Sequence, residues 1–455
     1  MTKLANKLLM AVLFLVHSYS NAQIVVGPIS NPHPRLFMNS SEIEAMKIRV
    51  ASNREPWKTA FVNLQARATA ASSRDPRPYT GTDPNTYGDY CRADAARARD
   101  LALMYHITGS DIYVRYARDY LMSWATATPL PASNLNKASI TGMLIGRATL
   151  PMMWAYDLLY NHPLMTGQIK ATIENWFKSL EIPIKSCKEY WHENDYFNKQ
   201  YYQNHLVAHT MGLLAIGYTI GDVGLVQFAV DHPDNSRDFV ELVQGCIFMP
   251  GDQPCSREYD QELWPVQKGE IYDRYRHQTA PEKGLQYSHL TMRLLTLTAE
   301  MALHNGLDFF HYTAPTGEKL ELPITFYADF HRLKDACIKG GYYCSYGYDE
   351  TPRIGIPGDN TSFWEIAFKY YPYNVEVAEL LGSIDRTAYP KLDSIIGDPV
   401  LTHGRKICWE GRQSVDINYD CIVNFEDMMY LAQNWLKCSL PFQEGCVEGD
   451  ILISD

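Results

Sequence analysis

The sequence predicts an all-α protein built as an (α/α) toroid, an incomplete barrel of helix hairpins, with a small C-terminal EF-hand-like appendage. Residues 92–108 and 284–304 carry apolar side chains at every third or fourth position, the spacing of amphipathic helices. Short turns in which Asp follows Gly separate the helical segments, at residues 109–111, 221–222 and 306–308. A left-handed Gly ends one helix and an Asp caps the next, so such turns join antiparallel helices. Strand patterns are sparse, which favours helix pairs whose inner helices surround a cleft.

Composition narrows the class of protein. The chain has 455 residues, of which 46% are hydrophobic and 20% are charged, enough apolar material for a large buried core. This composition excludes a disordered protein, a coiled coil and a collagen-like fibre. The net charge of −11 argues against nucleic-acid binding, which requires a basic surface, but is compatible with a polyanionic ligand in a locally basic cleft.

The N-terminus has the pattern of a secretory signal peptide. Two lysines precede an apolar run over residues 8–16, and small residues supply a cleavage site. The run is too short to span a bilayer, and no other stretch reaches the ~20 apolar residues that a spanning helix needs. We therefore expect a signal peptide over residues 1–22, cleavage near Ala22-Gln23, and a mature protein that is secreted to the periplasm or the extracellular space without a membrane span.

Ten cysteines agree with export to an oxidising compartment. Cys246 and Cys255 are close enough in sequence to form a local disulfide, as are Cys337 and Cys344, although spacing alone fixes no pairing. The sequence contains no Cys-x-x-Cys pair, so a zinc ribbon is not expected.

The C-terminal residues 401–455 form a separate predicted unit after a helical domain over residues 23–400. Residues 416–427 place oxygen donors at positions 1, 3, 5, 9 and 12 of a calcium-loop pattern, with a backbone carbonyl at position 7. The predicted ligands are Asp416, Asn418, Asp420, Ile422, Asn424 and Asp427. The loop resembles one dockerin repeat, although Cys421 replaces the usual Gly and dockerins have two repeats. We expect a structural Ca²⁺ and an appendage for sorting or for a cell-surface or scaffold partner.

Two polar clusters of the helical domain supply acid–base groups. One is Asn204-His205 at the start of a helix, and the other includes Asp273 and Arg276, with Tyr287 in the next helix. Removal of the C5 proton of a uronate needs donors or a cation on its carboxylate, a base, and an acid for the departing 4-oxygen. A Tyr beside a cation can supply base and acid when both groups lie on one face of the sugar. The set therefore fits β-elimination without a catalytic cofactor.

The same residues resemble the alginate lyase group of α/α-toroid polysaccharide lyases, nearest to families five and thirty-eight. The likeness covers most of residues 30–390 and rests on short motifs, which are His33 to Phe37, Gln203-Asn204-His205, and Gly269, Asp273, Arg276 and Tyr287. It implies that Asn204 and His205 neutralise the substrate carboxylate together with Arg276. It also implies that Tyr287 is both base and acid.

The sequence departs from the family-five pattern at two points. Gln203 stands where that family has a second Asn, and its Arg lies closer to the Tyr than Arg276 lies to Tyr287, which leaves Arg274 as a rival cation. Further candidates for substrate binding are polar or aromatic residues next to the two clusters, namely Gln203, Tyr202, Arg274, Tyr272, His277, Trp191 and His192.

Three functions remain in competition on sequence grounds. The leading one is a secreted lyase of 1,4-linked uronates, with mannuronate-rich alginate first and glucuronan second. A glycoside hydrolase on the same frame would need two carboxylates from among Glu258, Asp260, Glu262 and Glu270. A non-catalytic glycan-binding protein would not need the acid–base set. A metal at His205 and His209 is disfavoured, because Leu206 stands where a zinc protease has its Glu.

Overall fold

A computed structural model describes most of the helical domain and part of the tail. It covers residues 23–127, 138–258, 262–278, 283–333, 335, 338–339, 363–387, 392–407, 415–417 and 422–434. The predicted signal peptide and Cys337, Cys344, Cys408, Cys421, Cys438 and Cys446 lie outside these residues.

The described residues form a succession of helices. These are α2 (Ser40–Ala51), α3 (Trp57–Ser72), α4 (Pro84–Thr108), α5 (Asp111–Thr126), α6 (Ala138–Ala148), α7 (Leu150–Leu159), α8 (Gly167–Glu193), α9 (Asp195–Lys199), α10 (Asn204–Ile220), α11 (Val223–Val230), α12 (Phe239–Cys246), η2 (Tyr272–Gln278), α13 (Lys283–His304), α14 (Glu321–Leu333), α17 (Trp364–Tyr370), α18 (Val375–Ser383), α19 (Pro399–Thr402) and α20 (Phe425–Asn434).

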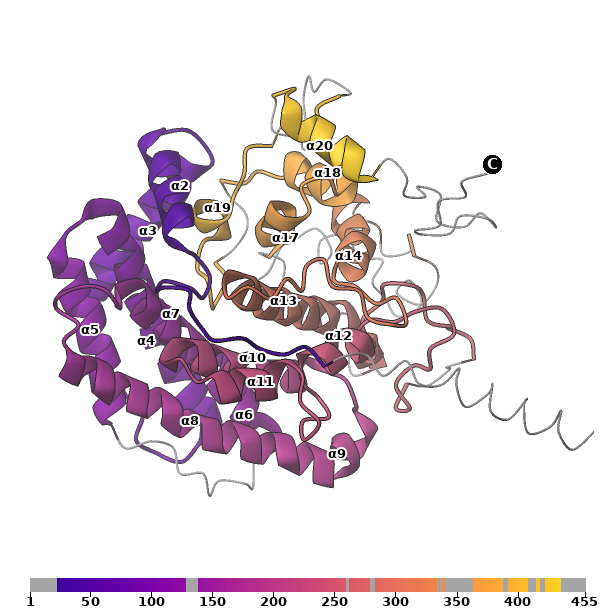
Figure 1. Cartoon of the computed structure of the whole chain (residues 1–455), viewed down its shortest axis with the longest axis horizontal. Coiled ribbons are helices and arrows are strands. Elements are labelled where there is room, and N and C mark those ends of the chain that lie inside the picture. Colours follow the sequence, from indigo (N-terminus) through magenta and orange to yellow (C-terminus); the bar gives the residue numbers. More distant parts are fainter. Residues whose placement is uncertain are drawn as a thin grey trace, which may run out of the picture.

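The helices curve around a centre, as the predicted toroid requires. Helices α5 and α8 lie on the outer margin of the arc, while α10 and α13 lie toward its middle (Figure 1). Helix α10 packs against α6, α8, α11 and α13 and is buried along most of its length. A helix that is apolar on all sides is expected at such a central position. Within the described residues no helix combines the length and apolarity of a membrane span.

Two of the three predicted Gly/Asp turns join helices directly. Gly109 and Gly221 end α4 and α10 with φ of 69° and 74°, and the Asp222 carboxylate accepts the Leu225 N–H at the start of α11. A residue with a Cβ would be strained at these positive φ angles. The third turn differs, because Asp308 accepts the N–H groups of Phe310 and His311 but the next helix, α14, begins at residue 321.

Glycines bring α6 and α10 unusually close together. A Cβ on Gly146 would fall 2.5 Å from the Ala208 carbonyl oxygen, and one on Gly212 would fall 2.8 Å from the Cα of Gly146. The two backbones are in direct contact at these positions, so only glycine fits there. This packing places the start of α6 beside the start of α10.

The N-terminal His33–Phe37 motif anchors the chain to the central helices. The buried Asp157 carboxylate of α7 accepts hydrogen bonds from the backbone N–H groups of Arg35 and Leu36, and it lies 2.6 Å from His33 Nδ1. Such a satisfied buried carboxylate fixes the chain that crosses it. The motif therefore has a structural role in this chain.

Two local features differ from what spacing and composition suggest. Cys246 and Cys255 are separate buried thiols, not a disulfide. Residues 76–90 and 231–270 are rich in Pro, Gly and polar residues, a composition typical of loops. Helix α4 nevertheless begins at Pro84, and α12 lies within residues 231–270. Pro at the first helical position costs no hydrogen bond, which reconciles Pro84 with a helix.

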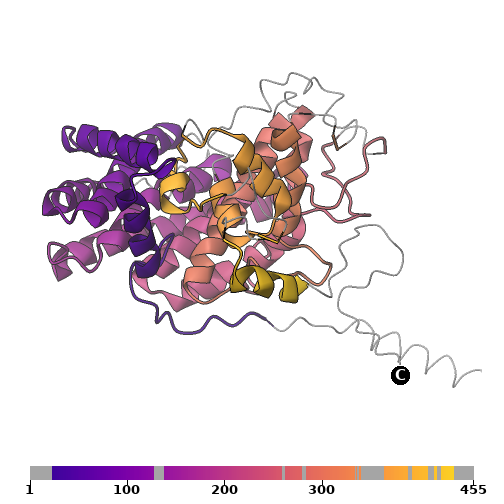
Figure 2. The same ribbon diagram turned by 90° about the horizontal axis from the view of Figure 1, so that it is seen from above.

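The C-terminal appendage contributes helix α20 at the margin of the helical domain (Figures 1 and 2). This helix begins at Phe425, within the last positions of the predicted calcium loop over residues 416–427. Its assignment as a dockerin-like unit stays a prediction.

Candidate active site

The first cluster forms at the N-terminus of α10, where Gln203 caps the helix. The Gln203 side chain accepts the His205 N–H at 3.3 Å and the Asn204 amide at 3.1 Å. Both Gln203 and Asn204 are buried. The sequence predicted Gln203 as a substrate-binding residue, but its exposed fraction of 0% and its capping bonds make it a residue that holds the backbone of Asn204 and His205.

The second cluster is joined to the first by Asp273. Its Oδ2 accepts the backbone N–H of Asn204 at 2.8 Å, the Asn204 amide at 3.3 Å and the Thr291 hydroxyl of α13. Its Oδ1 lies 3.8 Å from Nε of Arg276. Burial raises the pKa of Asp273, while Arg276 and these hydrogen bonds oppose that shift. One buried carboxylate thus connects α10, η2 and α13.

His205 is held as a neutral ring. Its Nδ1 lies 2.5 Å from the Ser139 carbonyl oxygen on α6, which can only accept, so Nδ1 carries the proton. Burial lowers the pKa of His205 to about 4, opposed by this hydrogen bond and aided by the charges of Arg276 and Arg147. Near neutral pH, Nε2 is therefore an unprotonated acceptor, and no described residue is hydrogen-bonded to it.

Arg276 and Tyr287 lie face to face. The Arg276 guanidinium carbon is 5.0 Å from the centre of the Tyr287 ring, and its Nη2 donates to Gln200 Oε1 at 3.3 Å. Both side chains are half-buried, and the Tyr287 hydroxyl has no hydrogen-bond partner among the described residues. A guanidinium in this place can stabilise negative charge that develops on a substrate bound next to the phenol.

Arg147 on α6 is a site residue that the sequence analysis missed. Its charge acts on both His205 and Tyr287, and within the described residues its guanidinium pairs with no carboxylate. Burial lowers the pKa of Arg147 to about 10, so it remains charged near neutral pH. No motif marks this residue. The only signal in the sequence is an Arg inside an otherwise apolar helix.

These groups can perform chemistry on an anionic substrate. Arg276 and Arg147 supply positive charge, Tyr287 supplies a phenol with an unengaged hydroxyl, and His205 supplies an acceptor nitrogen. The described residues contain no cluster of three or more His, Cys, Asp or Glu side chains that could hold a metal ion. The groups present act by proton transfer and charge stabilisation.

The alginate lyase family profile matches residues 47–335, which is more than half of the chain and includes every residue of this site. The chain belongs to the alginate lyase family. It is accordingly a polysaccharide lyase, in agreement with the prediction from sequence. No curated protein matches the chain.

Solved structures confirm the fold of the lyase. An alginate lyase from Bacteroides ovatus is 13% identical, with 82% of this chain and 99% of the other covered at a TM-score of 0.54. Alginate lyase A1-III from Sphingomonas species A1 is 16% identical over 80% of this chain and 94% of its own, at a TM-score of 0.54. A variant of A1-III complexed with a tetrasaccharide reaches a TM-score of 0.58 at 16% identity, covering 83% and 97%. The predicted (α/α) toroid is therefore confirmed.

The structure places Arg274 in the protein interior and not beside Tyr287, a position that does not favour the predicted substrate-binding role. Its exposed fraction is 1%, and its guanidinium contacts Glu258 at 2.8 Å and Glu270 at 2.5 Å. Two carboxylates already neutralise this cation in the protein interior. The neighbouring side chain Arg276 points to Tyr287 instead, since residues two apart do not share a face.

The remaining candidates are dispersed. Trp191 is buried behind His205, with ring centres 5.5 Å apart, and so supports that ring instead of facing substrate. His192 is exposed at the end of α8, where its Nδ1 lies 3.0 Å from the Tyr196 hydroxyl. Tyr202 and Tyr272 line a separate pocket. The side chain of His277 lies outside the described residues.

Proposed function

We propose that this lyase cleaves 1,4-linked mannuronate in alginate by β-elimination. The observation that carries the proposal is the contact of Arg276 with Tyr287, 5.0 Å from guanidinium carbon to ring centre, next to the neutral ring of His205. The family and the alginate lyases of the same fold support alginate as the polymer. Glucuronan is the second substrate to test.

In this mechanism two cations bind the carboxylate of the reacting sugar. Arg276 and Arg147 stabilise the negative charge that develops when the C5–H bond breaks. The phenolate of Tyr287 takes the C5 proton, the C5–H electron pair forms the C4–C5 double bond, and the C4–O4 bond breaks. The same phenol then returns its proton to the departing 4-oxygen.

His205 serves in this proposal as an acceptor. With its proton on Nδ1 and a pKa lowered to about 4 by burial, it has no N–H to offer a carboxylate through Nε2 near neutral pH. The sequence-based assignment of His205 as a neutralising donor is therefore revised. Asn204 directs its amide to Gln203 and Asp273, which supports a positioning role for its side chain.

A hydrolase mechanism fits the structure poorly. It requires two carboxylates facing the substrate. Glu258 and Glu270 are both buried and paired with Arg274, and Glu262 is exposed. Asp260 lies outside the described residues.

Ultraviolet absorbance during reaction tests the proposal. Purified protein is mixed separately with polymannuronate, polyguluronate and glucuronan, because elimination creates a conjugated unsaturated uronate and hydrolysis does not. We expect absorbance to rise fastest with polymannuronate and to fall by about 10²–10⁴-fold in Tyr287→Phe. Tyr113→Phe on the outer helix α5 is the matched control and should retain activity. New reducing ends without absorbance would exclude elimination.

We also propose that the tail binds Ca²⁺ through the residues predicted from sequence. The Asp427 carboxylate lies inside the loop, where it accepts the N–H groups of Ile417 at 2.7 Å and Asn424 at 2.8 Å. Asp416 and Asp427 are buried, and oxygen donors of this kind suit Ca²⁺. The expected ligands Asn418 and Asp420 lie outside the described residues.

Calcium binding is checked by isothermal titration with CaCl₂ and with MgCl₂. We expect Ca²⁺ to bind with one-to-one stoichiometry and Asp427→Asn to weaken it at least tenfold, because the substitution removes one charged oxygen ligand. Absence of heat in the full chain would refute the proposal. A scaffold or cell-surface partner of the tail can be sought once calcium binding is established.

Secretion is proposed from the N-terminal pattern alone. The expected outcome is a mature N-terminus at Gln23 when protein from the periplasm or the culture medium is sequenced. Protein retained in the cytoplasm with an intact Met1 would contradict it.

A further inference from the structure

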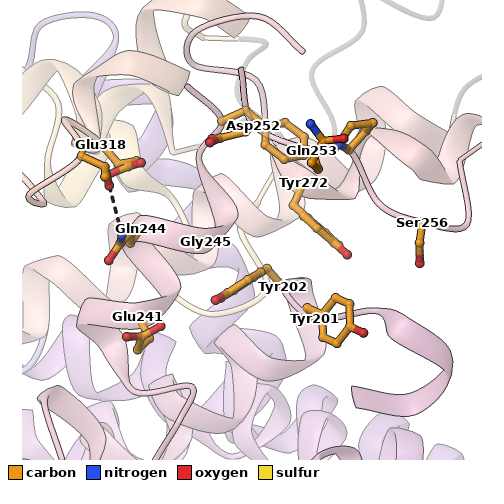
Figure 3. Close-up of a pocket in the computed structure, with 13 residues that line it drawn as sticks. Tyr201, Tyr202, Glu241, Gln244, Gly245, Asp252, Gln253, Ser256, Tyr272 and Glu318 are labelled. Carbon is orange, nitrogen blue, oxygen red and sulfur yellow. Dashed lines mark hydrogen bonds between the residues drawn. The ribbon is translucent and has the colours of Figure 1, made fainter. Parts of the chain in front are cut away.

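A cavity of about 530 Å³ opens to solvent near the chain segments that carry Asn204 and Asp273. Tyr202, two residues before Asn204, and Tyr272, one residue before Asp273, form part of its wall (Figure 3). Phe248 also lines the cavity. No residue of the proposed elimination machinery lines it. The cavity is thus a concave site distinct from the groups around Tyr287.

Aromatic side chains give this cavity a shaped apolar wall. The ring centres of Tyr202 and Tyr272 are 5.9 Å apart, and those of Phe248 and Tyr272 are 5.7 Å apart. The Tyr202 ring rests on bare backbone, because a Cβ on Gly245 of α12 would fall 2.0 Å from its Cε1 atom. Aromatic faces of this kind provide stacking surfaces for the C–H face of a sugar ring.

The remaining wall is acidic. Glu241, Asp252 and Glu318 line the cavity, and no Lys or Arg is among the described residues of its lining. Glu318 accepts the Thr316 hydroxyl at 2.6 Å, and Asp252 accepts the Met249 N–H at 2.7 Å, so both carboxylates are held in place. The Glu241 carboxylate forms no hydrogen bond with any described residue.

Nearby arginines do not reverse this charge. Arg237 stacks on the Tyr202 ring, 4.2 Å from its centre, but does not line the cavity. Arg274 lies 5.8 Å from the Phe248 ring and is paired with Glu258 and Glu270. Neither Arg237 nor Arg274 therefore offsets the three carboxylates of the lining.

This charge disfavours the uronate polymer as ligand and favours a cation. A carboxylate of an oligouronate would meet three like charges at short range, which costs binding energy. A metal ion would use the carboxylates but would leave the aromatic wall without a function. A pyranose that carries a free ammonium group uses both, because its ring can stack on the tyrosines while its ammonium approaches the carboxylates.

We propose that this cavity is a second carbohydrate site, specific for an amino sugar with a free ammonium group. It would let the lyase bind a cationic polysaccharide without occupying the site that holds its anionic substrate. The proposal does not depend on which uronate the lyase cleaves.

Isothermal titration with three hexasaccharides tests the proposal. The probes are glucosamine hexamer at a pH where its amines are protonated, N-acetylglucosamine hexamer as its uncharged counterpart, and mannuronate hexamer with Tyr287→Phe to prevent cleavage. We expect glucosamine hexamer to bind at least tenfold more tightly than the N-acetylated form, because hydrogen bonds from an ammonium group to carboxylates are stronger than those from a neutral amide. Added NaCl should weaken its binding.

Variants separate the cavity from general attraction to an acidic protein. Gly245→Ala changes no charge but forces the Tyr202 ring to move, so it should weaken the binding of glucosamine hexamer at least tenfold. Glu241→Gln should also weaken it, whereas Glu44→Gln, which removes an exposed carboxylate elsewhere, should not. Lyase activity on polymannuronate reports that each variant is folded.

Three results would overturn the proposal. Equal binding of the two glucosamine-based hexamers would make the cavity a site for neutral sugars. If Glu241→Gln and Glu44→Gln weaken glucosamine hexamer binding equally and Gly245→Ala has no effect, the hexamer is attracted only by the acidic surface and not by the cavity. Absence of glucosamine hexamer binding to active protein would leave the cavity without this ligand.

Discussion

The site around Tyr287 and the cavity around Tyr202 are built from the same two chain segments but carry opposite charge. Asn204 and Asp273 belong to the first, and Tyr202 and Tyr272, two and one residues earlier, belong to the second. Arg276 and Arg147 make the first site cationic, while three carboxylates make the second acidic. Proximity in the chain therefore says little about which ligand a residue meets.

The physical basis of this division lies in the start of α10 and the short helix η2. Successive side chains of a helix or helix start point in directions about 100° apart, so neighbours in sequence face different surroundings. The Asp273 carboxylate holds the two segments together between the sites. Changes at this contact should therefore act on the two sites unequally.

The largest effect is expected for Asp273→Asn. The amide cannot accept as strongly from Asn204 and Thr291, and it removes the charge next to Arg276. Loss of one member of a buried charged network costs about 3–5 kcal/mol of stability, and kcat/KM should fall about 10²–10³-fold as Arg276 and Tyr287 lose their alignment. Thermal unfolding and the absorbance assay measure the two effects.

A milder variant guards against a folding defect in that experiment. Thr291→Val removes one donor to Asp273 and should lower kcat/KM less. Asp252→Asn in the acidic cavity is the matched control and should leave polymannuronate cleavage unchanged. If Asp273→Asn cleaves polymannuronate at more than half the normal rate, Asp273 does not organise the site.

An intermediate effect is expected for Arg147→Met. Loss of this positive charge near His205 and Tyr287 should raise KM for polymannuronate about tenfold or more, with a smaller change in kcat, and Arg147→Lys should restore part of it. Arg92→Met, at a more exposed cation of α4, provides the comparison. An unchanged KM would remove Arg147 from the substrate site.

The smallest effect concerns pH and His205. Because burial lowers its pKa to about 4, the folded protein keeps His205 neutral at pH 5–7, and kcat/KM should show no titration from this residue there. The unfolded chain takes up the proton near pH 6.5, so stability falls as pH drops from 6.5 toward 4. His205→Gln should reduce that acid-induced loss, whereas His192→Gln at an exposed position should not.

Nuclear magnetic resonance titration of the imidazole signals measures the His205 pKa directly. A value above 6 would contradict the neutral ring and would restore His205 as a protonated donor to the substrate carboxylate. The same spectra of His205→Gln assign the signal.

The sequence determined the local features of this protein. Helix formation and helix ends depend mainly on residues that are close in sequence. The apolar spacing in α4 and α13 and the left-handed glycines at 109 and 221 therefore made the helices and two of the three hairpin turns predictable. The motifs at Asn204-His205 and Tyr287 also identified the family. Composition was a poor guide at residues 84–90, which are helical although their Pro, Gly and polar content is typical of a loop.

Only the tertiary structure decided which side chains meet. Arg274 and Arg276 are two residues apart, yet one is buried between Glu258 and Glu270 and the other lies over Tyr287. Arg147 enters the site because Gly146 lets α6 contact α10. Packing between segments that are distant in sequence decides how deeply a side chain is buried and which charged groups it meets. Burial and these neighbours in turn set the tautomer of a His, the pKa of a titratable group and the class of ligand that a site binds, none of which follows from spacing along the chain alone.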